Sequence, residues 1–170
     1  MPRTILPHPI ALATLLLASV VSAQAHQVWL ENTEGQALLF FGEFHDNLRE
    51  SSPGALDKFL GTPVLAQHTA AGQQEVGGQL TAKGFAYPIS HDARTLFVTA
   101  SYPLIDRSKR NEAALLWVPA ARWVATPSQS VSANGQALDL VPTGQNGQFK
   151  VVFNGQALPK AKVQMVAPSG

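Results

Sequence analysis

Cysteine is absent from this chain of 170 residues. Its absence excludes disulfide bonds, thiolate metal sites and cysteine nucleophiles. Imidazole, carboxylate and backbone groups are then the ligands that the protein can offer to a metal ion. The fold must also be stabilised without covalent cross-links, by packing and hydrogen bonds.

An excess of charge of either sign is also lacking. The chain has 12 Lys and Arg residues against 11 Asp and Glu residues, and loss of Arg3 with an N-terminal signal peptide makes the balance 11 to 11. Without a basic stripe, nucleic acid is not an expected partner. The sequence also lacks a Gly-x-Ser-x-Gly elbow, a His-Glu-x-x-His pair and a phosphate-binding glycine loop. We therefore do not expect hydrolase or nucleotide chemistry, and we expect a protein that is not an enzyme.

Residues 1–25 have the three parts of a secretory signal peptide. Arg3 provides the positive start, an apolar run extends from Ile10 to Val21, and Ala23-Gln24-Ala25 matches the small-x-small cleavage pattern. The run is shorter than the roughly 20 residues of a membrane-spanning helix. This pattern favours a cleaved signal over an uncleaved anchor and predicts a periplasmic or secreted mature protein.

Short runs rich in β-branched and aromatic residues, separated by Gly, Pro and Asn, predict an all-β mature chain. Thr95 to Tyr102 is apolar on both alternating faces, which predicts a strand buried on both sides. A short helix is expected from Pro53 to Leu60, with Ser52 as its cap and Gly61 after its end. The predicted strands are Gln27 to Glu31, Ala37 to Phe41, Thr95 to Ser101, Gln148 to Phe153 and Lys162 to Val166.

Two Asn-Gly pairs, Asn134-Gly135 and Asn154-Gly155, predict tight hairpin turns. The segment from Phe149 to Pro168 looks like the opening strand pair of an immunoglobulin-like or transthyretin-like module. A lone hairpin is marginally stable in water, so this pair must pack on the preceding residues or belong to a truncated domain, and we favour truncation. The expected organisation is a signal peptide at 1–25, a β-rich domain at 26–144 and a partial immunoglobulin-like hairpin at 145–170.

His26 is the strongest candidate metal ligand. Cleavage after Ala25 would make it the first residue, which offers an α-amine and an imidazole to one metal ion. Cleavage after Ala23 would place it third, where the amine, two backbone amides and the imidazole can surround a copper(II) or nickel(II) ion in a plane. The alternative is that His26 only follows the export segment.

Three other histidines of the mature chain are weaker candidate ligands. Each stands in an expected loop or at a strand end, where a ligand can be presented, but none has a recognisable spacing partner. Asp92 could orient the ring of its neighbour, although the same residues are also typical of a turn. These candidates are His45, His68 and His91.

Several motifs resemble a bacterial exported family of unknown function that is grouped with accessory proteins of nickel and cobalt uptake transporters. The motifs are His26 to Leu30, Phe40 to Glu43, Asn47 to Glu50, Ser52 to Asp57, Leu138 to Thr143 and Phe149 to Pro168. The resemblance implies a periplasmic β-sandwich, often followed by an immunoglobulin-like domain, with His26 as the ligand that transfers by position. This chain departs from the pattern where the second domain should continue.

These observations support three functions, in decreasing order. The first is a non-catalytic periplasmic protein that binds nickel, cobalt or copper in support of a membrane metal-uptake transporter. The second is a metal-independent module that contacts another envelope protein, and the third is a copper-dependent oxidative enzyme that uses His26 as a brace. The charged run from Asp106 to Glu112 is expected to be a solvated loop, with partner docking as its alternative.

Overall fold

The structure, a computed structural model, describes residues 26–126 and 136–166. The expected signal peptide, its cleavage positions and the Asn134-Gly135 turn lie outside these residues. The described chain is almost entirely β, which confirms the all-β prediction. No helix within it is long and apolar enough to cross a membrane.

The first sheet has an antiparallel order β1-β2-β7-β6, with β3 paired to the end of β2. A tight turn at Glu34-Gly35 joins β1 to β2, and both residues have positive φ, 43° and 85°, as a two-residue hairpin turn requires. The pairing β1–β2 then extends over seven residue pairs. The strands are β1 (Gln27–Thr33), β2 (Gln36–Glu43), β3 (Leu48–Arg49), β6 (Gln79–Leu80) and β7 (Phe85–Pro88).

The second sheet is antiparallel in the order β5-β4-β8-β9. Its strand β8 has the double burial that its sequence predicts: Leu96 and Val98 lie in the core, and Phe97 on the opposite face is also buried. The Arg122 guanidinium covers the Phe97 ring at 4.2 Å. The strands are β4 (Leu65–Thr69), β5 (Gly72–Val76), β8 (Thr95–Thr99) and β9 (Ala120–Val124).

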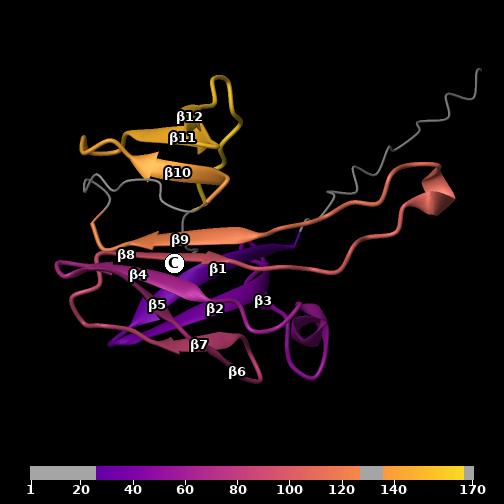
Figure 1. Ribbon diagram of the computed structural model, residues 1–170, viewed down its shortest axis with the longest axis horizontal. Coiled ribbons are helices and arrows are strands. Elements are labelled where there is room, and N and C mark those ends of the chain that lie inside the picture. The colour runs from indigo at the N-terminus through magenta and orange to yellow at the C-terminus, as the bar shows by residue number, and fades with distance from the viewer. Residues whose placement is uncertain (1–25, 127–135, 167–170) are drawn as a thin grey trace, which may run out of the picture.

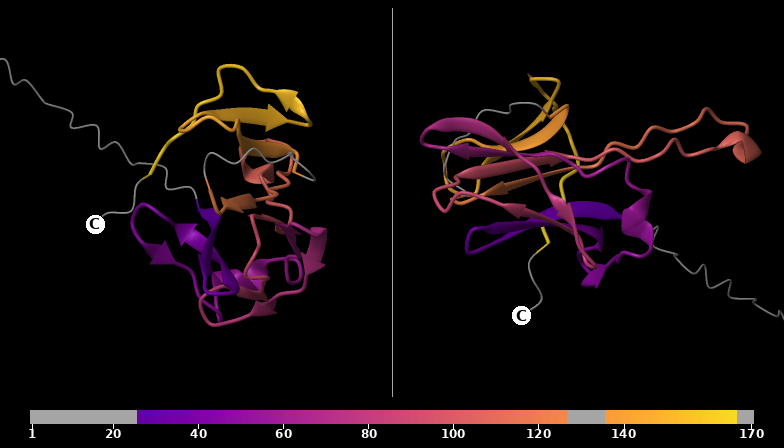
Figure 2. Two further views of the ribbon diagram at one scale, coloured as in Figure 1. Left: turned by 90° about the vertical axis from the view of Figure 1, so that its left-hand side faces the viewer. Right: turned by 60° about the horizontal axis from the view of Figure 1, so that its bottom comes forward.

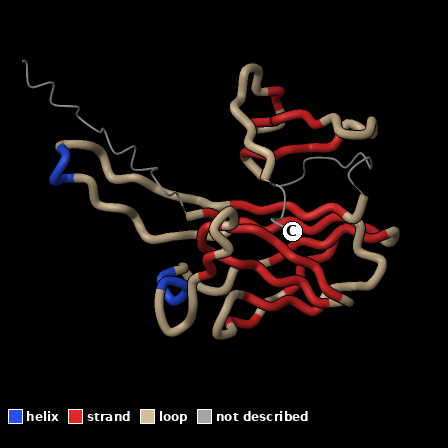
Figure 3. The backbone as a smooth tube through the Cα atoms, turned by 180° about the vertical axis from the view of Figure 1, so that it is seen from behind, coloured by secondary structure: helices blue, strands red, loops and turns tan. Residues whose placement is uncertain are grey.

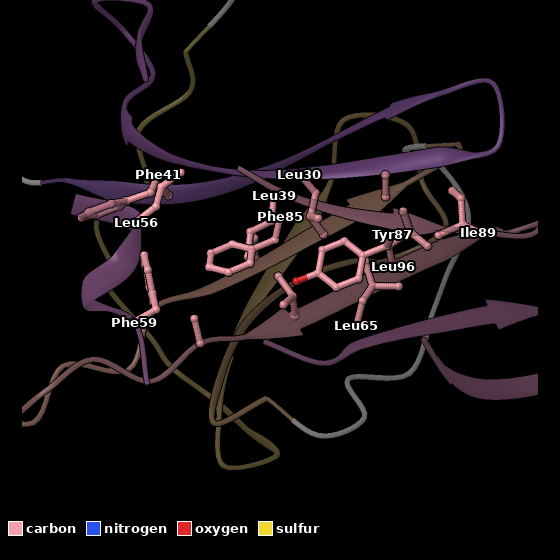
Figure 4. Close-up of a cluster of buried hydrophobic side chains, with 14 of the residues drawn as sticks. Leu30, Leu39, Phe41, Leu56, Phe59, Leu65, Phe85, Tyr87, Ile89 and Leu96 are labelled. Atoms are coloured by element: carbon pink, nitrogen blue, oxygen red, sulfur yellow. The ribbon is translucent and has the colours of Figure 1, made fainter. Parts of the chain in front are cut away.

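The two sheets pack face to face as a sandwich, with β1 beside β9 at one side (Figures 1 and 2). Alternate residues of β2, β7 and β8 point inward and, with residues of β1, β4 and β9, form the core between the layers (Figure 4). Tyr87 is fully buried there, and its hydroxyl donates to the Pro63 carbonyl at 2.9 Å. Burial raises the pKa of the Tyr87 hydroxyl, so the group stays a neutral hydrogen-bond donor.

The expected short helix is a single 3-10 turn, η1 (Ala55–Lys58), so the predicted range was too long. Ser52 does not cap its backbone, because the Ser52 hydroxyl donates to Asp57 Oδ1 at 2.7 Å. The Asp57 carboxylate instead accepts the Gly54 N–H at 2.6 Å. These two hydrogen bonds stabilise the turn and lower the pKa of Asp57. The Ser52 bond is the larger cause and the Gly54 bond the smaller.

A third sheet, order β10-β11-β12, lies above β9 in Figure 1. Its strands are β10 (Leu138–Pro142), β11 (Phe149–Phe153) and β12 (Gln156–Ala157). The turn at Asn154-Gly155 has positive φ at both residues, which confirms that hairpin. Because β10 pairs with β11, the sheet spans the domain boundary expected at residue 144.

The strand predicted from Lys162 to Val166 was wrong, since these residues form no strand. On the side away from β10, β11 pairs with the short strand β12. Leu158 then donates a last backbone hydrogen bond to Val151 at 2.9 Å. Pro159 follows and has no N–H with which to continue the ladder. The hairpin therefore ends three residues after its turn, at Leu158.

Two polar contacts attach the third sheet to the sandwich. Arg122 of β9 and Asp139 of β10 form a bidentate ion pair, with Nε at 2.7 Å from Oδ1 and Nη2 on Oδ2. The Gln136 side chain donates to the carbonyls of Val98 and Ala121, each at 3.1 Å. Residues near the hairpin thus pack on the preceding sheet through a buried charge pair and backbone carbonyls.

Residues 101–119 form an arm that leaves the sandwich after β8 and returns at β9 (Figures 1 and 3). Its two sides are joined at Ile105 and Leu115, whose backbones exchange hydrogen bonds of 2.9 and 3.0 Å. A 3-10 turn, η2 (Ser108–Arg110), forms the tip. The Ser108 backbone N–H donates to Asp106 and lowers the pKa of that carboxyl.

Candidate functional site

His26 stands directly before β1, and the hairpin register decides what lies beside it. Gln27 pairs with Gly42, so His26 continues the ladder opposite Glu43, the last residue of β2. The turn at residues 44–47 brings β3 back along the other side of β2, and the Glu50 N–H donates to the Phe41 carbonyl at 2.8 Å. Strand pairing therefore gathers one imidazole and two carboxylates.

The His26 ring has a glutamate at each nitrogen. Its Nε2 lies 2.7 Å from Glu50 Oε1, a hydrogen bond, and its Nδ1 lies 3.8 Å from Glu43 Oε1. The His26 side chain is 38% exposed and that of Glu50 28%, whereas that of Glu43 is only 9% exposed. The Glu43 carboxylate is thus the buried neighbour of the imidazole, and the Glu50 carboxylate is the neighbour that solvent can reach.

Aromatic rings form the floor of the site. The Phe41 ring lies 5.0 Å from the His26 ring, centroid to centroid, and also contacts Phe59 and Trp117 at 5.2 and 5.8 Å. Tyr102 stacks edge-on against Trp117 at 5.4 Å. This apolar floor restricts His26 to the rim of the sandwich, because its ring packs on Phe41 on one side and meets solvent on the other.

The donor set suits a divalent transition metal. An imidazole nitrogen and carboxylate oxygens bind Co²⁺, Ni²⁺, Cu²⁺ and Zn²⁺, and a neutral imidazole with two carboxylates has a formal charge of −2. A buried carboxylate such as Glu43 is normally paired or ligating. Within residues 26–126 and 136–166, no three His, Asp or Glu side chains are already arranged as a ligand group. The His26–Glu50 hydrogen bond must therefore open before both residues can share an ion.

The other predicted histidines lie elsewhere. His45 is exposed in the turn at residues 44–47, and His91 is exposed in the turn at residues 91–92. His68, on β4, bonds through Nε2 to Gln73 Oε1 at 2.8 Å, and its ring packs against Phe97. Among the described residues, His26 is the histidine with a recorded carboxylate contact at each ring nitrogen.

Asp92 forms a hydrogen bond within its own turn. Its Oδ1 accepts the Ser90 hydroxyl at 2.6 Å. That bond is the main cause of the lowered pKa of Asp92, and the charges of His91 and Arg94 contribute less. The Ser90-His91-Asp92 segment is thus a turn closed by its own side chains.

Sequence reasoning found His26 but missed Glu43 and Glu50 as its neighbours. Glu43 could have been found by counting outward from Glu34-Gly35, because a two-residue turn pairs Thr33 with Gln36 and hence His26 with Glu43. No similar count reaches Glu50, whose position depends on where β3 rejoins β2.

Comparison with protein-family models, with curated proteins and with solved structures finds no match to this chain. The resemblance to an exported family thus stays a prediction.

Proposed function

We propose that the mature protein is a non-catalytic, exported metal-binding protein that holds nickel, cobalt or copper at His26 and supplies it to an uptake system in the periplasm. The observation that carries this proposal is the pairing of His26 with Glu50 at 2.7 Å and with Glu43 at 3.8 Å. The membrane metal-uptake transporter suggested by the sequence resemblance is the proposed partner.

The chemistry of binding follows from the donors. A metal ion at Nε2 would take the place of the proton shared by His26 and Glu50, with the imidazole and the Glu50 carboxylate as ligands. An ion at Nδ1 would instead lie beside Glu43. Cleavage after Ala25 would add the His26 α-amine, which can chelate an ion together with Nδ1, the ring nitrogen on the Glu43 side. Affinity should rise from cobalt to nickel to copper, and it should weaken as pH falls, because protons compete for the same nitrogens.

The first experiment combines intact mass with calorimetry on protein recovered from the periplasm. The mass locates the mature terminus, and titration with Ni²⁺ or Cu²⁺ should give one site of micromolar or tighter affinity. His26→Ala should weaken binding about 100-fold or more, and Glu50→Gln by about 10-fold, as for lost ligands and their neighbours.

His91→Ala is the matched control, because His91 is exposed in a turn away from the carboxylate pair. Its affinity should equal that of the unaltered protein. Equal affinity in His26→Ala would overturn the proposal, and so would a loss of equal size in His91→Ala.

The arm at residues 101–119 favours a second candidate, a metal-independent module that binds an envelope protein. Leu104 is 66% exposed, Leu116 61% and Val118 48%, and exposed apolar side chains gathered on one projection are typical of an interaction surface. Cross-linking in the periplasm with and without a chelator separates the candidates. A chelator-resistant adduct that is lost in Leu104→Ser/Leu116→Ser would select the interaction module.

A further inference from the structure

A groove of about 490 Å³ lies between the outer side of β9 and the third sheet, away from the His26 site. Its volume is within the range of about 300–1,000 Å³ found for small-molecule pockets. Chain segments from three places meet there: β9, the β10–β11 pair and residues 162–164. Neither the metal proposal nor the arm uses this groove.

The third sheet turns an apolar face to this groove. Pairing places Leu140 opposite Val151 and Pro142 opposite Phe149, and strand alternation puts Leu138 on the same face. The exposed fractions of Leu138, Leu140 and Phe149 are 55%, 38% and 46%. Large apolar side chains that line a groove and remain open to solvent favour an apolar ligand.

The charges of the groove leave one cation uncompensated. Arg122 and Asp139 neutralise each other in their ion pair, whereas Lys162 is exposed at the lining. Arg122 itself is buried, with an 8% exposed side chain, and its Nη1 has no hydrogen-bond partner among the described residues. Lys162 is therefore the cation of the lining that is free to pair with an anionic oxygen of a ligand.

A peptide strand suits this groove less well than an alkyl chain. Each peptide unit brings an N–H and a C=O that need partners when buried. Both hydrogen bonds of the Gln136 side-chain amide already go to the carbonyls of Val98 and Ala121. An alkyl chain needs no such partners, and it matches the apolar face.

We propose that this groove binds a free fatty acid, a single-chain amphiphile with one carboxylate. The alkyl chain packs along Leu140, Phe149 and Val151, and the carboxylate lies at Lys162. The single negative charge of the ligand balances the single uncompensated charge of the lining.

The test is calorimetric titration of the mature protein with dodecanoate below its micelle concentration, with a chelator present to remove any metal. Dodecanoate should bind at one site and more tightly than octanoate, by about fourfold for each added methylene that is buried. Dodecyltrimethylammonium, which has the same chain and the opposite charge, should bind at least about fivefold more weakly.

Two variants with the same charge change separate the groove from the general field of the protein. Lys162→Glu should weaken dodecanoate binding about fivefold or more, whereas Lys160→Glu, two residues before it and outside the lining, should not. Leu140→Ser should weaken both amphiphiles, and its melting curve checks that the sheet remains folded.

Failure to bind dodecanoate would overturn the proposal. If dodecyltrimethylammonium bound as tightly as dodecanoate, Lys162 would not contribute to binding. The groove would then be an apolar surface without preference for a fatty acid, which would also overturn the proposal. Equal loss in Lys160→Glu and Lys162→Glu would show a nonspecific electrostatic effect and would also overturn it.

Discussion

The sandwich and the third sheet are built from similar β-patterned segments, yet they bury them differently. In the sandwich, Leu39, Leu65 and Leu96 are at most 1% exposed, because a second sheet covers each apolar face. In the third sheet, Leu138 and Phe153 are about half exposed, and the most buried groups include the charged Asp139. Alternation of apolar residues is therefore sufficient to form a strand, whereas a buried core also requires a second sheet that covers the apolar face.

The largest expected effect concerns the ion pair that attaches the third sheet. Arg122→Met should destabilise this attachment by about 3–5 kcal/mol, because it leaves Asp139 as a buried charge without its partner. Hydrogen exchange should show protection lost in β10 and β11 and kept in β2 and β8. The double variant Arg122→Met/Asp139→Leu should recover part of the lost stability. If Arg122→Met reduced protection equally in β10 and β11 and in β2 and β8, the third sheet would not open separately from the sandwich, and the prediction would be contradicted.

Paired leucine substitutions test the burial difference directly. Leu96→Ala should lower the free energy of unfolding by about 2–5 kcal/mol, since it opens a cavity in the covered core. Leu138→Ala, the same change on a half-exposed side chain, should cost about 0.5 kcal/mol or less. Urea denaturation measures the free energy of unfolding of both variants. If Leu138→Ala lowered it as much as Leu96→Ala, the apolar face of the third sheet would be covered in solution.

Loss of the Gln136 side-chain hydrogen bonds should destabilise the attachment of the third sheet by a smaller amount. Its amide donates to the Val98 and Ala121 carbonyls, so Gln136→Ala should weaken the attachment of the third sheet by about 1 kcal/mol. Exchange of the β10 amides should speed up by about fivefold. Gln145→Ala, at an exposed loop position, is the control and should leave exchange unchanged.

The smallest effect is a pH dependence within the sandwich. The Ser52 and Gly54 bonds lower the pKa of Asp57 in the folded protein. The stabilisation is therefore present above the ordinary carboxyl pKa of about 4 and is lost as pH falls through the lower folded value. Ser52→Ala should move the pKa of Asp57 upward in an NMR titration of its carboxyl carbon, and an unmoved pKa would contradict the assignment.

Much of the fold was predictable because its signals are local. Double burial was predicted for Thr95 to Tyr102 from side-chain alternation, and it is confirmed for Thr95 to Val98. The Asn154-Gly155 turn, predicted from positive φ, is also confirmed. The predictions of a strand from Lys162 to Val166 and of a short helix that spans Pro53 to Leu60 were wrong, also for local reasons. Pro159 ends the hairpin ladder, and Asp57 closes the η1 turn in place of a Ser52 cap.

The candidate site shows where prediction from sequence stops. Local sequence patterns account for strands such as β2 and β8, for the Asn154-Gly155 turn and, by counting outward from Glu34-Gly35, for the pairing of His26 with Glu43. The packing of the sheets places Glu50, 24 residues from His26 in the sequence, at the His26 ring, and it covers one apolar face while another stays open. These features depend on non-local packing of whole sheets, whose free energy no short window of residues contains.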